Sequence, residues 1–202
     1  MTFKKAYLLF LFVIPFFCGS YSYAQYSKNI DSLIKATTVK IYENPDEVIA
    51  IGNKIVSNSG DDVNIKIKGY KLISYAYSSK RDYQKSLEYV IKANDLLNQT
   101  TNKLLKISII VKAGIQYHQL KIYDKSIQFL DQSEKMCLEY PVRDSVNIHL
   151  GINYIVRGFI YKEKLNCDIA IAYFNKGIKE VSMSKVDVDA SFTKISIAKY
   201  NI

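Results

Sequence analysis

The sequence predicts an all-α fold in which one helical unit recurs along the chain. Four stretches begin with turn-forming polar residues and then place a short side chain in the first turn of an apolar helical pattern. These short residues lie 38, 40 and 44 residues apart: Val48, Ser86, Ser126 and Ala170. A unit that recurs every ~20–50 residues is typical of a solenoid, in which each repeat packs on the next. No stretch has the apolar–polar alternation of a strand.

A second pattern is in phase with the first. Twelve residues before each of the last three short residues lies another small residue, a tyrosine follows it three positions later, and a further small residue follows each short residue by seven. The sets are Ser74, Tyr77 and Ala93, then Gly114, Tyr117 and Ser133, then Gly158, Tyr161 and Gly177. Helix axes approach to ~8 Å only where side chains are short. We therefore expect Gly114 and Ser126 to face each other across one helix pair.

These sets resemble the tetratricopeptide repeat (TPR) family, in which each repeat is two antiparallel helices. The resemblance implies a right-handed α-solenoid over residues 25–202, with about four helix pairs and the start of another. The sequence departs from the family pattern at the leading aromatic position, where it has Tyr70, Ile110 or Tyr154 and never Trp. Its repeats are also longer than is usual in the family.

Residues 1–24 have the layout of a cleaved secretory signal peptide. Lys4 and Lys5 precede an apolar run over residues 6–17, and Ser22-Tyr23-Ala24 supplies small residues for cleavage before Gln25. The run is shorter than the ~20 residues that span a bilayer, which argues against an uncleaved anchor. Phe17 before Cys18 argues against a lipoprotein. We expect an exported chain, periplasmic or otherwise extracytoplasmic.

The first two helices follow from local signals. Residues 28–42 carry a partial apolar stripe, and Pro45 suits the first turn of a helix that ends near Ser57. Asn58-Ser59-Gly60 is a stop signal. Asp61 is the expected N-cap of the next helix, which continues through Tyr77.

The later helices share apolar residues at spacings of three and four. The predicted ranges are about 82–97, 104–117, 127–136, 144–164 and 168–183. Thr101 is the expected N-cap of the second of them.

Asp187 or Asp189 should open a last helix. A step of 40 to 44 residues from Gly158 reaches positions 198–202, the middle of a new first helix. We therefore expect the chain to be truncated, with the natural protein continuing beyond residue 202.

The distribution of charge argues against nucleic-acid binding, and the positions of the cysteines argue against a disulfide. The formal net charge is +9, but the lysines are spread through every predicted helix with no run of five. This distribution favours solvated faces over nucleic-acid binding, and the membrane should be contacted only through the leader or a missing downstream segment. Cys137 and Cys167 should lie at opposite ends of parallel helices, so we expect free, partly buried thiols.

The sequence lacks the motifs of an enzyme. It has two histidines, His118 and His149, no Cys-x-x-Cys spacing, no His-Glu-x-x-His pair and no Gly-rich phosphate loop. We predict no catalytic residues, no metal site and no cofactor.

The TPR resemblance implies that first helices line a concave groove that binds a protein or peptide. The positions expected in that groove are Lys71, Tyr75, Ser78, Ile115, His118, Gln119, Phe159 and Lys162. Lys71 fits one place of the lysine–asparagine clamp that some members use for a C-terminal carboxylate, but the asparagines are missing. For His118, the simpler interpretation is a half-exposed surface residue.

Two functions remain open at this stage. The first is a non-catalytic, exported scaffold that binds proteins or peptides. The alternative is the sensory N-terminal region of a membrane-anchored transcriptional regulator or kinase, because exported arrays of this long-repeat type resemble the sensory half of such bacterial regulators. The effector domain would then lie beyond residue 202.

Overall fold

The computed structural model describes residues 29–184, so the predicted leader at 1–24 and the helix expected from Asp187 or Asp189 lie outside the described residues. Residues 29–38 are helical, and seven α-helices follow. Their bounds are α2 Pro45–Ser57, α3 Val63–Ser79, α4 Tyr83–Asn94, α5 Lys103–Gln119, α6 Tyr123–Leu138, α7 Asn147–Glu163 and α8 Cys167–Ser182. The 3₁₀ turns Leu97–Gln99 and Arg143–Ser145 lie between pairs. Within 29–184 there is no strand, as predicted.

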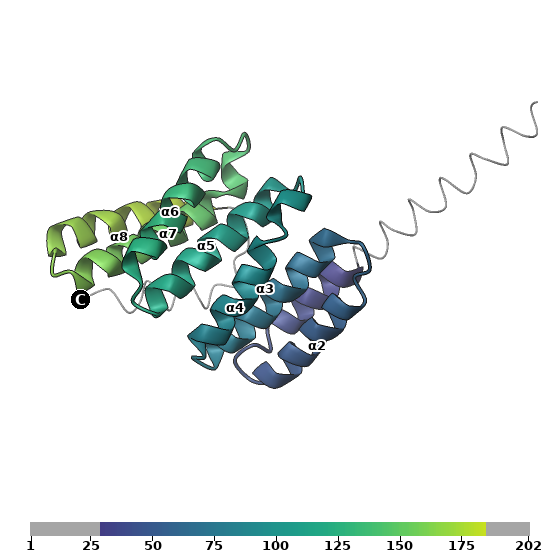
Figure 1. Cartoon of the computed structure of the whole chain (residues 1–202). Helices are drawn as coiled ribbons and strands as arrows, with labels where there is room; N and C mark the ends of the chain where they lie inside the picture. The colour runs from purple at the N-terminus through teal and green to yellow at the C-terminus, as the bar shows by residue number, and fades with distance from the viewer. Residues whose placement is uncertain (1–28, 185–202) are drawn as a thin grey trace, which may run out of the picture.

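The helices stack in sequence order from α2 to α8, each packing on the next (Figure 1). Residues 29–38 with α2, α3 with α4, α5 with α6, and α7 with α8 are successive pairs. The first helices α5 and α7 also contact each other directly. This arrangement is a TPR-like helical repeat, which confirms the predicted fold class of stacked helix pairs.

The same tight turn closes three of the pairs. Arg81, Lys121 and Leu165 follow the first helices α3, α5 and α7, and their φ angles are 60°, 61° and 58°. Non-glycine residues seldom adopt this left-handed conformation. In each turn the next amide donates back to the carbonyl of the repeat tyrosine, Tyr77, Tyr117 or Tyr161. The structure therefore repeats at the level of its backbone turns.

Side-chain caps begin α2, α3, α4, α5 and α8, whereas α6 and α7 begin without one. Asp62 accepts from the Ile65 amide at 3.0 Å, and Asn102 accepts from the Leu105 amide at 3.0 Å. The expected caps, Asp61 and Thr101, each lie one residue too early. The N-cap residue is the one whose side chain accepts a hydrogen bond from the amide three positions later. Where two polar residues are adjacent, the sequence alone does not show which of them is the N-cap.

The expected crossing of small residues is confirmed in two pairs. Ser126 Oγ donates to the Gly114 carbonyl at 2.8 Å, and Ser86 Oγ donates to the Ser74 carbonyl at 2.8 Å. A Cβ on Gly114 would lie 2.9 Å from Leu130 Cδ2. Close approach of the two helices in each pair therefore depends on these short side chains.

Each repeat tyrosine stacks on an aromatic residue of the second helix. The ring pairs are Tyr77 with Tyr89 at 5.6 Å, Tyr117 with Phe129 at 5.4 Å, and Tyr161 with Tyr173 at 5.4 Å between centroids. The second ring always lies three residues after the short residue of its helix. The Tyr89 ring therefore packs within its repeat.

Among the described residues, both cysteines are free thiols, as expected, but their burial differs. Cys137 is buried between α6 and α7, whereas Cys167 at the start of α8 is exposed. Among the described helices none has the length and hydropathy to cross a membrane. Within the same residues no group of three His, Cys, Asp or Glu side chains is arranged to hold a metal ion.

Candidate functional site

A cavity of about 300 Å³ opens on the side of the molecule formed by first helices. Its walls come from residues 29–38, α3 and α5, which are the first helices of three consecutive pairs. The lining residues are Asp31, Ile34, Thr38, Lys68, Lys71, Leu72, Tyr75 and Leu105. Apolar side chains and the Tyr75 ring therefore form much of the cavity, with charged side chains around them.

Two lysines converge beside this cavity. Lys71 Nζ lies 6.0 Å and Lys112 Nζ 4.3 Å from the centre of the Tyr75 ring. Lys71 also donates to Ser108 Oγ at 3.3 Å. We call Lys71, Tyr75, Ser108 and Lys112 the lysine cluster; it joins α3 to α5.

Burial and mutual repulsion disfavour the charged forms in this cluster. Burial, followed by the charge of Lys68, lowers the pKa of Lys71 to about 8. Burial and the charge of Lys71 lower the pKa of Lys112 to about 7. Burial raises the pKa of Tyr75 to about 12, and burial with the charge of Lys71 lowers that of His149 to about 4. At neutral pH Lys71 is therefore mostly charged and Lys112 is partly charged, while His149 and Tyr75 are neutral.

A separate aromatic group surrounds His118 between α5, α6 and α7. The His118 ring lies 5.8 Å from Phe159 and 6.2 Å from Tyr123 between centroids. His118 Nε2 is 3.4 Å from a carboxylate oxygen of Glu163, which also accepts a hydrogen bond from the Tyr123 hydroxyl. Burial lowers the pKa of His118 despite Glu163. Only 8% of His118 is exposed, so the interpretation as a half-exposed residue is wrong.

The structure brings some predicted groove residues together and separates others. Lys71 and Tyr75 lie in the lysine cluster, and His118 and Phe159 lie in the aromatic group. Ile115 packs against the apolar clusters between repeats. Ser78 is half-buried, and Gln119 and Lys162 are exposed. Their role in binding stays a prediction.

Sequence reasoning missed Lys112, Ser108 and His149. Lys112 falls 40 residues after Leu72 and 44 residues before Val156, so the other repeats have an apolar residue at its position. This break in the repeat pattern could have identified it. Ser108 and His149 have no such signal, because only the stacking of α3, α5 and α7 places them near Lys71.

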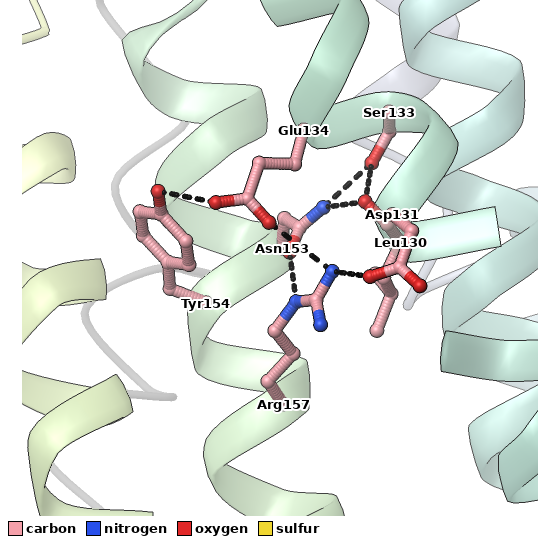
Figure 2. A network of polar contacts seen from close by, with 7 residues as sticks. All are labelled: Leu130, Asp131, Ser133, Glu134, Asn153, Tyr154 and Arg157. Atoms are coloured by element: carbon pink, nitrogen blue, oxygen red, sulfur yellow. Dashed lines mark hydrogen bonds and ion pairs between the residues drawn. The ribbon is translucent and has the colours of Figure 1, made fainter. Parts of the chain in front are cut away.

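A buried polar network joins α6 to α7 (Figure 2). Arg157, 5% exposed, donates to Asp131 at 2.6 Å, to Glu134 at 3.2 Å and to Asn153 at 2.9 Å. Asn153 in turn donates to the Leu130 carbonyl at 2.5 Å. Two carboxylates neutralise the charge of Arg157, so the network stabilises the packing of neighbouring repeats and is not an open binding site.

Comparisons with known proteins add little beyond the fold. No family model and no curated protein matches the sequence. Among solved structures, the crystal structure of MamA is similar, with a TM-score of 0.45 and 16% sequence identity, over 78% of this chain and 92% of that chain. This similarity assigns no ligand or activity to the chain described here.

Proposed function

We propose that this protein is an exported, non-catalytic scaffold that binds a protein or peptide segment on its first-helix side. The observation that carries the proposal is the cavity, whose walls come only from first helices of three consecutive pairs. A surface built from several repeats suits an extended ligand, because each repeat can contact a different part of it. Two of the first-helix residues predicted from the sequence, Lys71 and Tyr75, line this cavity.

We propose no catalytic role for this chain. His118 faces the carboxylate of Glu163 and lies among aromatic rings. Export rests on the layout of residues 1–24. Mass spectrometry of the exported protein tests it, because a retained Met1 would contradict cleavage after Ala24.

Binding is tested by selecting short peptides from a random displayed library with the full chain. The parent should enrich specific sequences, and a Thr38→Tyr variant, which fills the cavity without removing core atoms, should bind them more weakly. Thr101→Tyr makes the same change at an exposed position and should bind like the parent. No enrichment with the parent, or equal binding by both variants, would reject the cavity as the binding surface.

The regulator alternative uses the same ligand-binding surface. It is distinguished by the parental gene, in which a membrane-spanning segment and a DNA-binding or kinase module would follow residue 202.

A further inference from the structure

The lysine cluster carries positive charge that its surroundings do not neutralise. Within residues 29–184, Lys71 donates to Ser108 and Lys112 lies over the Tyr75 ring, and neither forms an ion pair with a carboxylate. The nearest acid in the cavity wall, Asp31, is held by Lys68 at 2.6 Å. A buried ammonium without a carboxylate is unfavourable. The arrangement therefore costs stability unless something else supplies negative charge.

We propose that the lysine cluster binds a carboxylate of an acidic peptide segment, an Asp or Glu side chain, while a neighbouring apolar side chain of that segment enters the cavity. This inference rests on the proposed function and specifies its ligand. Both ammonium groups lie near one tyrosine ring, Lys112 at 4.3 Å and Lys71 at 6.0 Å from its centre, and the two lysines are close enough for the charge of Lys71 to act on Lys112. A carboxylate held by Lys71 at the cavity wall is also attracted by the charge of Lys112, whereas the Ser108 hydroxyl donates to the Leu105 carbonyl and only positions Lys71.

The shape of the site favours a peptide over a flat anionic surface. Lys112 is only 4% exposed, so a ligand must reach into the molecule to contact it. The adjacent cavity of about 300 Å³ has Ile34, Leu72 and Leu105 in its wall, which suits an apolar side chain. A peptide with an acidic residue beside a large apolar one satisfies both halves of the site at once.

The experiment applies the displayed-peptide selection described above to the parent and to a Lys71→Met/Lys112→Met variant of the full chain. Methionine keeps most of the side-chain length and removes the charge. A Lys54→Met/Lys135→Met variant loses the same net charge at exposed positions of α2 and α6, and is the matched control. Thermal unfolding establishes that each variant is folded before binding is compared.

The expected result is that peptides enriched by the parent contain Asp or Glu next to a large apolar residue. The affinity of one such labelled peptide, measured by fluorescence anisotropy, should fall about tenfold or more in the cluster variant and little in the control. Replacing the acid of the peptide by its amide should weaken binding to the parent similarly, and should not weaken binding to the cluster variant further. The amide peptide also serves as the test on the parent alone if the cluster variant does not fold.

Each other outcome overturns the inference in a different way. Enriched peptides without an acidic residue would reject the carboxylate site while leaving the scaffold function intact. No enrichment at all would reject the proposed function together with this inference. Binding to phosphatidylglycerol vesicles that is lost in the cluster variant, with no acidic peptide enriched, would assign the lysines to a lipid headgroup instead.

Discussion

Arg157 and Lys112 are two cations buried in neighbouring repeats, 5% and 4% exposed, with opposite surroundings. Arg157 is held by Asp131 and Glu134 and by the amide of Asn153. Lys112 has only the face of the Tyr75 ring, 4.3 Å away. A desolvated contact with an aromatic face contributes about 2 kcal/mol and so offsets only part of the cost of burying an ammonium. Two carboxylates, by contrast, neutralise the charge of a guanidinium.

Arg157 therefore stabilises the packing between repeats, whereas Lys112 is available to a ligand. The planar guanidinium has five donors in a fixed fork, so side chains of the chain itself can saturate it. The ammonium groups of Lys71 and Lys112 repel each other, and neither forms an ion pair in residues 29–184; the charge of Asp31, which is paired with Lys68, is the smallest influence on the pKa of Lys71. Removing the first cation should therefore weaken the fold, and removing the second should strengthen it.

The largest effect is expected for Arg157→Met. The substitution leaves the amide oxygen of Asn153 and one carboxylate oxygen of Glu134 without the donor that Arg157 supplies, so the free energy of unfolding should fall by about 2–4 kcal/mol. Chemical denaturation measures it. Lys40→Met, which breaks an exposed ion pair with Glu47, should leave stability unchanged within error. Equal small losses in both variants would show that the network contributes nothing to the stack.

The opposite sign is expected for Lys112→Met. Removing an unpaired buried charge should raise the free energy of unfolding by about 1 kcal/mol, after the lost contact with the Tyr75 ring is subtracted. Lys135→Met, at an exposed position of α6, should change it little. If Lys112→Met destabilises the protein as a core truncation does, the ammonium is part of the architecture and the contrast with Arg157 fails.

The gain from Lys112→Met should shrink as the pH rises from about 7 toward about 10. An unfolded lysine titrates near ~10.4, whereas the pKa of Lys112 in the folded chain is about 7. The unfolded state binds the extra proton in this window, so the parent gains stability with rising pH. Below pH ~7 the cost is fully present.

The neighbours of Lys112 do not obscure that comparison. His149, with a pKa of about 4, and Tyr75, with a pKa of about 12, keep their charge across the window. Lys71, with a pKa of about 8, loses its proton as the pH rises in both parent and variant. The Asp31–Lys68 ion pair is common to both proteins. Denaturation of both proteins at several pH values measures the gap; a gap that does not change with pH would mean that Lys112 is solvated.

The smallest change in stability is expected for Ser108→Asp, which converts the lysine cluster into an arrangement like that of Arg157. A carboxylate at this position meets Lys71, whose ammonium already lies 3.3 Å from Ser108 Oγ. Stability should change by less than about 1 kcal/mol, because the attraction to Lys71 is offset by the cost of burying the carboxylate. Binding of an acidic peptide should be lost because the site is already neutralised. Ser108→Asn, of the same size without the charge, should retain binding. Undiminished binding by Ser108→Asp would place the peptide elsewhere.

Local patterns determined much of the fold. The short residues at Ser86 and Ser126, and the small residues at Ser74 and Gly114, predicted which helices meet and where, because close packing requires short side chains wherever it occurs. The tyrosines of the repeat were predicted as well, although their stacking partners were not. Helix starts were placed to within one residue where two polar residues compete for the cap, as at Asp61 and Asp62.

The candidate site was only half predictable. Lys71 and Tyr75 followed from their positions on a first helix, because each repeat places the same positions on the same side. Lys112 and Ser108 did not, because their nearness to Lys71 depends on how α5 stacks on α3. Lys71 and Ser108, which form a hydrogen bond, are 37 residues apart in the sequence. The burial of His118 against Glu163 also depends on how the helices stack, because these two residues are 45 positions apart in the sequence.

The sequence by itself therefore determined the helices, their pairing and the side of the molecule that first helices form, because these depend on periodicity and side-chain size within one repeat. Only the tertiary structure decided which buried cation is neutralised and which is not. Charge balance depends on distances of a few ångströms between side chains of different repeats. Those distances are set by the packing of whole helices, and no local pattern in this chain records them.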